Sequence, residues 1–588
     1  MEALTTSNSQ VTLRSPDRSL QQLAAEKNLE CRSKCRSWRV RGIIAIILAA
    51  FVVCGVANLV LTFCSMFMDI PYWTVKRITS TLEIVLVVVP RIVMVLASLF
   101  CVITFAVSLL WYKEEPVLHL ADFMQRVEYP SVDVFLPRYK EDWDLYEPTV
   151  QAALALDYPE DRLVVHVLDD GSRSAPLQTH LEPLMRQHSN LRYVTRPNGS
   201  HAKAGNLNNA LSESHNTLVV VFDADHRCKP DFLLRTIPHL LSVVDGHRVA
   251  RLSNQTAFVQ TTQVFHNEER PLVRLLDGKH TLFYKLMMPS FSGMGCAFCV
   301  GTGYVMQRVA LDSIGGYVCD CAVEDVVTAV AMHKGGWRSK FLECRLTEGL
   351  SPETLNEFYT QRERWVAGSA QLLIYRCCML TKLLPIKYRL AYLVGAWYWL
   401  VMLMFLFLIL IRLTMWVVFQ SISGIQTTTW VPLLSEYIPI YALFLLLPIM
   451  SFETKITNII AIFTLFPTYF SVFWGCLCGR IHPDRHTFRV TGSAEAFGDS
   501  WPKLAHINLA FIACITLVFC ISCIPELHVY EVPLDWMVPS VFVGWSYLVN
   551  IPVLFDLGRR IFITCVCATR RLLSFRTSQS LVMDKVTV

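Results

Sequence analysis

Charged side chains are scarce in this sequence. They make up 17% of the 588 residues, whereas hydrophobic residues make up 53%. Long apolar runs carry much of that hydrophobic content, which argues against an ordinary soluble protein. The composition therefore predicts an integral membrane protein.

A strong excess of one charge sign is also missing. The formal net charge is +5, and basic residues gather beside the apolar runs, so phosphate and lipid head groups suffice as partners and no nucleic acid is expected. Internal repeats and paired CxxC units are absent as well, which leaves no zinc site of that type. Many of the 20 cysteines lie inside apolar runs, and we expect thiols rather than disulfides.

Six apolar runs are long enough to be membrane spans, since a hydrocarbon core of about 30 Å needs roughly 20 apolar residues. A seventh apolar segment, 456–478, contains Pro467 and is interpreted as an interfacial helix, with a seventh span as the alternative. Basic residues before the first run and after the last place both termini in the cytosol. The six runs are Val40 to Phe63, Leu82 to Tyr112, Leu390 to Phe419, Tyr437 to Phe452, Leu504 to Cys523 and Leu534 to Leu557.

These runs divide the chain into a series of predicted regions with one large cytosolic insert. The order is a basic N-terminal segment (1–39), two spans (40–112), the cytosolic domain with its interfacial helices (113–388), four spans (389–557) that enclose the interfacial helix and a cytosolic loop (480–500), and a cytosolic tail (558–588).

The insert alternates apolar strands with helical stretches, as in an α/β domain. The predicted strands are VDVFLPRY, RLVVHVLDDGS, LRYVTRP, TLVVVFDAD and AFVQTTQVF. Two of them lead into paired acids, Asp169 with Asp170 and Asp223 with Asp225, the latter followed by His226. In a strand Asp223 and Asp225 would share a face, where oxygen ligands suit a divalent cation, although a solvated turn would explain one such pair.

Three further polar clusters follow this pattern. Lys203 begins a predicted helix, where it could face an anionic diphosphate or simply be a surface lysine. Glu324 and Asp325 begin another helix, and helix capping alone would explain them. The segment QRERW ends at Trp365, which an interfacial helix with a tryptophan anchor would also explain.

Taken in order, these segments resemble the processive family 2 glycosyltransferases, with the cellulose synthases as the most similar group. The motifs are DDG at Asp169 to Gly171, the HAKAGN stretch, DADH at Asp223 to His226, VGTG at Val300 to Gly303, VED at Val323 to Asp325 and QRERW at Gln361 to Trp365.

The resemblance implies an α/β glycosyltransferase-A (Rossmann-like) domain inserted in a polytopic α-helical membrane protein. It implies a role for each motif: Asp325 as catalytic base; Asp169, Asp170, Lys203, Asp223, Gln361 and Arg364 at the donor; Trp365, Glu324, Gly301 and Thr302 at the acceptor; and Asp223, Asp225 and His226 around Mg²⁺ or Mn²⁺. One base without a carboxylate nucleophile implies inversion, which turns an α-linked UDP-sugar into a β-linked polysaccharide. UDP-glucose is the expected donor, and the growing polysaccharide is the acceptor.

Differences between this sequence and the family pattern also lead to predictions. Phe488, Val490 and Thr491 match part of the cytosolic gating loop, but no lysine follows them. Residues 558–588 are too few for the cyclic-dinucleotide-sensing domain of bacterial cellulose synthases, and the insert looks too short for the large plant insertions. We therefore expect a compact catalytic subunit.

Several alternatives stay open at this stage. The same fold makes hyaluronan, chitin or mannan, and nonprocessive relatives glycosylate lipid carriers. A transporter with a regulatory domain is a third class, for which the intramembrane Arg91 and Arg412 could be quoted. The sequence favours the plasma membrane over the Golgi, and it leaves open the linkage (β-1,4, β-1,3 or mixed) and whether the chain forms a homo-oligomer.

Overall fold

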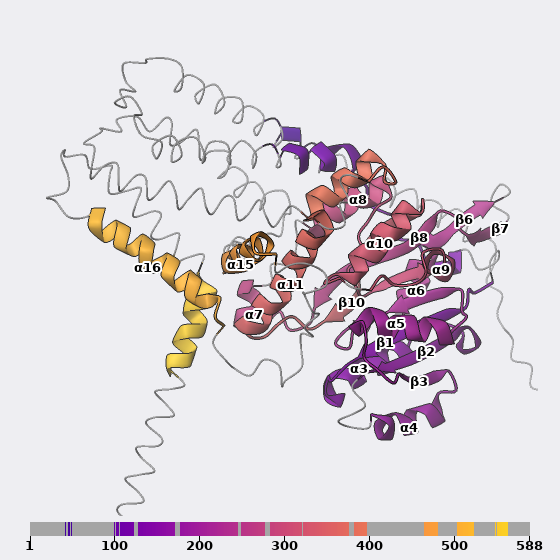
Figure 1. Cartoon of the computed structure of the whole chain (residues 1–588). Helices are drawn as coiled ribbons and strands as arrows, with labels where there is room; N and C mark the ends of the chain where they lie inside the picture. Colours follow the sequence, from indigo (N-terminus) through magenta and orange to yellow (C-terminus); the bar gives the residue numbers. More distant parts are fainter. Residues whose placement is uncertain are drawn as a thin grey trace, which may run out of the picture.

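The fold is described from a computed structural model of the whole chain (Figure 1). The described part covers residues 128–374, except 171–176, 245–248, 277–282 and 320. It also covers 102–104, 106–122, 381–396, 464–479, 502–522 and 550–562, together with a few isolated positions.

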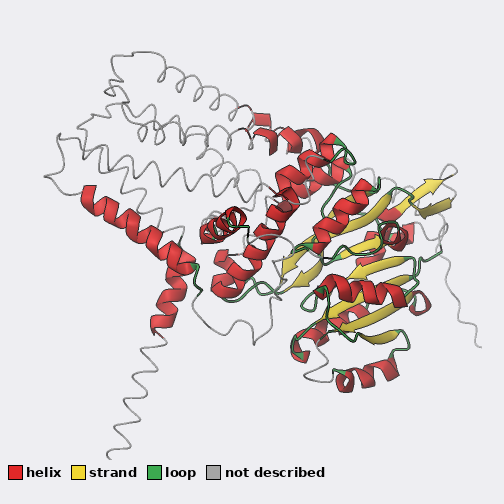
Figure 2. Ribbon diagram, viewed as in Figure 1, coloured by secondary structure: helices red, strands yellow, loops and turns green. Residues whose placement is uncertain are grey.

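An eight-stranded mixed sheet forms the centre of the domain between Val132 and Gly349, with helices on both faces (Figure 2). The strand order is β3-β2-β1-β4-β9-β8-β10-β5, and β6 pairs with β7 in a separate hairpin. The five predicted strands are confirmed as β1, β2, β3, β4 and β8, whereas β5, β9 and β10 complete the sheet without having been predicted. The strands are β1 (Val132–Arg138), β2 (Leu163–Asp169), β3 (Leu191–Thr195), β4 (Leu218–Val221), β5 (Arg227–Cys228), β6 (Leu241–Val244), β7 (Val249–Leu252), β8 (Thr256–Phe265), β9 (Tyr304–Gln307) and β10 (Arg338–Gly349).

The strands β1 to β4 are parallel to one another, so their carboxyl ends meet at one edge of the sheet. Strand β9 then runs antiparallel between β4 and β8. β4 is apolar throughout because both of its faces are covered: Leu218 and Val220 belong to one core, and Val219 and Val221 to the core on the opposite face.

Each face of the sheet has its own helices. Residues of α3 (Trp143–Leu154) and α6 (Phe232–Thr236) fill the first core. Residues of α5 (Ala202–Glu213), α9 (Arg308–Asp312) and α10 (Glu324–Lys334) fill the second. Helix α4 (Gln178–Gln187) contacts the edge strand β3. This three-layer arrangement fixes the starts of α5 and α10 relative to the strand ends.

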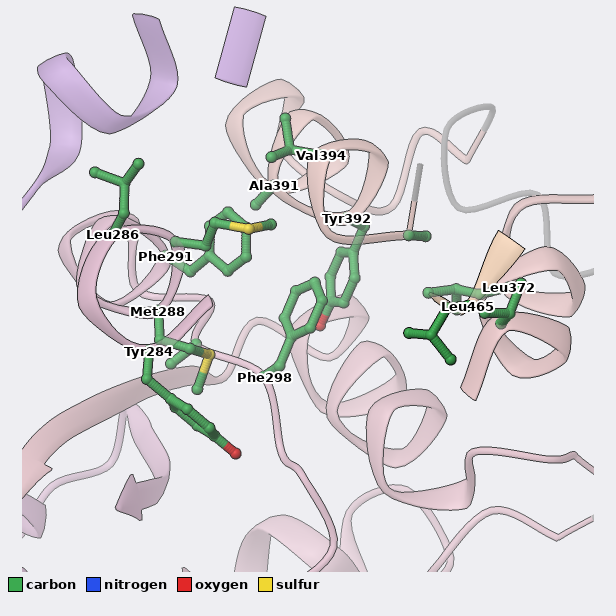
Figure 3. Packing of buried hydrophobic residues seen from close by; sticks show 14 of the residues in the cluster. Tyr284, Leu286, Met288, Phe291, Phe298, Leu372, Ala391, Tyr392, Val394 and Leu465 are labelled. Carbon is green, nitrogen blue, oxygen red and sulfur yellow. The ribbon is translucent and has the colours of Figure 1, made fainter. Parts of the chain in front are cut away.

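A third apolar core joins the sheet domain to later segments of the chain. Within it the ring of Phe298 stacks on Phe291 at 4.9 Å and on Tyr392 at 4.8 Å between centroids (Figure 3). Residues of α10 and of the helix 386–396 contribute to this core, together with η5 (Phe283–Met287), α7 (Pro271–Leu276), α8 (Met288–Met294), α11 (Leu355–Ile374), α15 (Phe466–Leu477) and α16 (Ala505–Ser522).

The predicted membrane segments fall largely outside the described residues. Leu504 to Cys523 is the run with the fullest description, as α16. Pro467 lies in the first turn of α15, where a missing N–H costs little, and the Ser471 hydroxyl of this helix donates to Glu363 of α11 at 2.9 Å. Among the helices that the structure describes, none combines the length and the apolar character that a membrane span needs. The six spans and the gating-like loop at 480–500 stay predictions.

Candidate active site

The parallel strands bring the acidic segments together at one edge of the sheet. Arg138 at the end of β1 is in register with Asp169 at the end of β2, and Asp170 follows directly. β4 ends at Val221, two residues before Asp223. Val221 is paired with the first residue of β9, so the VGTG loop that precedes β9 lies beside Asp223.

Asp169 and Asp170 are each held by an arginine. Arg138 donates to Asp169 at 2.9 Å, and the Tyr193 hydroxyl donates to the other oxygen of Asp169 at 2.9 Å. Arg196 makes two hydrogen bonds to Asp170, both at 2.6 Å. The Asp169 side chain is 0% exposed and the Asp170 side chain 6%. The structure therefore places both predicted donor-site acids in ion pairs that are internal to the domain.

Lys203 lies in the first turn of α5, as predicted. Its ammonium donates to Asp223 at 2.5 Å and to the carbonyl oxygen of Gly301 at 2.8 Å. Burial alone would lower the pKa of Lys203, but the charges of Asp223 and Glu324 outweigh it and the pKa is raised. Lys203 is therefore a stable cation that links two of the predicted motifs.

The prediction that Asp223 and Asp225 share a face of the strand is wrong. β4 ends before them, and they lie in a turn in which the N–H of His226 donates to the carbonyl of Asp223. The two oxygens of Asp225 have other partners: one lies 2.9 Å from His226 Nδ1, and the other accepts the N–H of Leu350 at 3.1 Å. Burial would raise the pKa of Asp225, but the charge interaction and the hydrogen bond with His226 outweigh it and the pKa is lowered.

His226 is placed as a support for Asp225. Its Nε2 atom is buried without a hydrogen-bond partner, and its ring packs so closely on Gly349 that a Cβ there would lie 2.3 Å from it. No group of three or more His, Cys, Asp or Glu side chains within the described residues is arranged to hold a metal ion. Carboxylates are suitable ligands for a cation of the Mg²⁺ type, which takes its other ligands from phosphates and water.

Asp325 occupies the first turn of α10, next to Glu324. One of its oxygens accepts the N–H of Val326 at 2.8 Å, as a capping residue would. The other oxygen faces the VGTG loop: a Cβ on Gly301 would lie 2.9 Å from it and 3.5 Å from Lys203 Nζ. Burial and the adjacent Glu324 charge raise the pKa of Asp325 to about 7. A carboxylate with this pKa suits a general base at neutral pH.

Gly301 and Thr302 differ in what they can contact. Gly301 has φ +88°, a conformation that favours glycine, and a side chain there would enter the space between Asp325 and Lys203. Thr302 is 0% exposed, and its hydroxyl accepts the N–H of Asp223 at 3.0 Å. The Thr302 side chain therefore supports the Asp223 turn, and its contact with an acceptor stays a prediction.

The QRERW segment lies on α11, which packs against the start of α10. Gly368 of this helix touches Val323 so closely that a Cβ would lie 2.4 Å from the valine, and Gln371 accepts the N–H of Ala322 at 3.1 Å. Burial and Glu324 raise the pKa of Asp325, and the Arg364 charge offsets part of that rise, so Arg364 interacts with Asp325. Trp365 is half-buried, with the Arg362 guanidinium 4.3 Å from its ring centroid.

The chain is similar to known glycosyltransferases. The family model "Glycosyltransferase like family 2" matches residues 130–368, a range that holds Lys203, Asp223 and Asp325. Cellulose synthase 2 of Novacetimonas hansenii is 31% identical over 331 residues, which are 55% of this chain and 20% of that protein. The UDP-forming cellulose synthase catalytic subunit of Xanthomonas axonopodis pv. citri is 33% identical over 293 residues, 49% of this chain and 37% of that protein.

Residues 130–368 are therefore similar to family 2 glycosyltransferases, and the two relatives named above are cellulose synthases. The chain spans well under half the length of these relatives. A mannosyltransferase from Pyrobaculum calidifontis, solved in complex with GDP-Man and Mn²⁺, aligns with a TM-score of 0.45 at 17% identity, over 66% of this chain and 99% of that one.

Sequence patterns did not reveal the residues that hold the candidate site together. Arg138, Arg196 and Tyr193 bind the first acid pair. Gln260, which is 0% exposed in β8, donates to the carbonyl of Thr302 at 2.8 Å and accepts the N–H of Val300 at 3.0 Å. The polar run QTTQ inside an otherwise apolar strand was the available signal for Gln260. No comparable signal marked Arg138 and Arg196, because the acid that each of them binds lies at the end of a different strand.

Proposed function

We propose that this chain is a processive, inverting glycosyltransferase that polymerises a β-glucan from UDP-glucose and passes it across the membrane in which it is embedded. The catalytic domain and both termini would lie in the cytosol, with the plasma membrane as the expected location. One observation carries the chemical part. Asp325 and Lys203 approach the same point beside Gly301, so a base and a diphosphate-binding cation face one small space.

The proton of the acceptor hydroxyl would pass to Asp325. Its capped oxygen fixes the carboxylate on α10, and the second oxygen faces the space beside Gly301. As the hydroxyl oxygen bonds to the anomeric carbon, the bond to the diphosphate breaks, and the leaving group takes the negative charge. Lys203 would stabilise that charge, because it stays protonated and lies at the start of a helix.

A divalent cation would be held by Asp223 and Asp225 and would neutralise charge on the diphosphate when bound. Asp223 is suited to this contact because its side chain is 36% exposed beside Lys203. Asp225 offers a carboxylate whose direction is set by His226 and Leu350.

Trp365 would carry the acceptor sugar. An aromatic face matches the apolar C–H face of a pyranose, and Arg362 fixes the indole by packing on it. The sequence supports an exported polymer, since an apolar run begins at Leu390, shortly after this helix. The relatives named as cellulose synthases favour a glucan, and the name "UDP-forming" favours a UDP-sugar donor.

The test is synthesis by purified full-length protein in lipid nanodiscs with Mg²⁺ or Mn²⁺. Each UDP-sugar is supplied separately, and linkage analysis identifies any polymer. We expect a β-linked glucan from UDP-glucose. Polymer from UDP-N-acetylglucosamine or GDP-mannose alone would replace the proposed product, and transfer of a single sugar to lipid would replace processivity. Trp365→Ala should retain UDP binding and lose chain elongation.

A further inference from the structure

Arg196 makes an unusually complete set of contacts at the edge of the site. Its guanidinium donates twice to Asp170 at 2.6 Å, to the carbonyl of Ser200 at 2.6 Å and to the carbonyl of Ala202 at 2.8 Å. The Arg196 and Asp170 side chains are each 6% exposed. Bidentate arginine–carboxylate pairs with this geometry are rigid as well as strong.

The contacts of Arg196 cross from one element to another. Asp170 follows β2, whereas Ser200 and Ala202 form the turn that begins α5. In that turn His201 and Ala202 both have positive φ, at 59° and 45°, which side-chain-bearing residues rarely adopt. Such a conformation persists only where the surroundings fix it, and two of the fixing bonds come from Arg196.

Gly205 makes this arrangement possible. A Cβ on Gly205 would lie 2.5 Å from Arg196 Nη1 and 2.2 Å from the carbonyl oxygen of Ser200. The guanidinium therefore fills space that any other residue at this position would occupy. The packing explains why a glycine is tolerated inside the first turns of a helix, where it is otherwise unfavourable.

We infer that Arg196 is a positioning residue for donor binding: it couples the carboxylate of Asp170 to the start of α5 and thereby sets the place of Lys203. This inference rests on the proposed function, because it assumes that Lys203 faces the donor diphosphate. It also changes the predicted role of Asp170. With both oxygens bound by Arg196, Asp170 acts on the donor through Arg196 and α5 rather than by direct contact with the nucleoside.

The test measures the dissociation constant of UDP, with Mg²⁺ present, for the full chain in nanodiscs. Arg196→Met should weaken UDP binding by about 10- to 100-fold, the loss typical of a misplaced binding group. Arg196→Lys keeps the charge and part of the contacts and should recover part of the affinity. Arg308→Met is the matched control, since Arg308 donates to Leu211 and Ser214 at the other end of the same helix. It should bind UDP as the wild type does.

A double-mutant cycle separates direct from indirect action of Asp170. If Asp170 acts through Arg196, the combination Asp170→Asn with Arg196→Met should be no weaker than Arg196→Met alone. Multiplicative losses would overturn the inference, because they would mean that each residue contacts UDP independently. Equal losses in Arg196→Met and Arg308→Met would overturn it too, as a general loosening of α5.

Two further outcomes separate a failure of the proposed function from a failure of the positioning role alone. If the wild-type protein binds neither UDP nor UDP-glucose, the proposed function fails. If it binds UDP and Arg196→Met binds equally well, only the positioning role fails. Should Arg196→Met not fold, Arg196→Lys takes its place as the test variant, and it should weaken UDP binding relative to the wild type.

Discussion

Two strands of the sheet, β2 and β4, each lead into a pair of carboxylates, yet the two pairs have different surroundings. The side chains of Asp169 and Asp170 are 0% and 6% exposed, and each has an arginine partner. Asp223 is 36% exposed beside Lys203, and Asp225 is 27% exposed beside His226. The same local pattern thus gives two closed ion pairs at one strand end and two accessible carboxylates at the other.

The difference shows that cations from elsewhere in the chain decide what an acid pair does. Arg138 and Arg196 take up the hydrogen-bonding capacity of the first pair and tie it to neighbouring loops. The second pair keeps exposed oxygens that a ligand could reach. We therefore expect the first pair to contribute mainly to the architecture of the site and the second pair to contact ligands.

The largest effect should come from Asp325, the proposed base. Asp325→Asn keeps the size of the side chain but removes its basicity, so glucan synthesis should fall by about 10²- to 10⁴-fold while UDP still binds. The measurements are initial rate and UDP affinity. Asp312→Asn, on the exposed end of α9, is the control and should have the wild-type rate. Near-normal synthesis by Asp325→Asn would remove the base assignment.

The next prediction compares the two pairs directly. Asp169→Asn leaves the Arg138 guanidinium, which is 8% exposed, without a charged partner, and should destabilise the domain by about 3 kcal/mol. Asp223→Asn should change stability by less than about 1 kcal/mol, because that side chain is partly solvated. Denaturation midpoints measure both, and metal-dependent UDP binding should fall in Asp223→Asn. Equal midpoints for the two variants would contradict the contrast between the pairs.

A moderate effect is expected from pH. The pKa of Asp325 is raised from 3.8 to about 7, and a general base must be deprotonated to act. The synthesis rate should therefore fall about tenfold per unit as the pH drops below 7, and level off above it. Lys203 adds no bend to the pH–rate profile between pH 5 and pH 8, because its pKa is raised above the ordinary lysine value. A rate that stays constant from pH 8 to pH 5 would show that Asp325 is not the proton acceptor.

The smallest effect concerns topology. Asn198 and Asn254 begin glycosylation sequons, and both are exposed in the domain that contains the two acid pairs. Because we place this domain in the cytosol, replacing either residue by Gln should leave electrophoretic mobility unchanged, with or without endoglycosidase. Glycan on either residue in a native host would reverse the proposed orientation.

The sequence predicted those features that depend on neighbouring residues. Apolar runs gave five strands of the sheet, and the helix starts at Lys203 and Asp325 followed from local patterns. The turn at Asp223 was misread because an apolar run does not show where strand pairing stops. Arg196 could not be found, since its role depends on β2 and β3 being neighbours and on the left-handed turn before α5.

The stacked rings of Phe291, Phe298 and Tyr392 have a mechanical consequence. Phe298 lies in the apolar core, and the same short segment of chain continues to Gly301, beside Lys203 and Asp325. Tyr392 belongs to a helix, 386–396, that runs into the third predicted span. A shift of that helix cannot leave Phe298 in place without breaking the stack. The chain segment beside Gly301 and the helix that leads into the third predicted span are therefore coupled through one stack of aromatic rings.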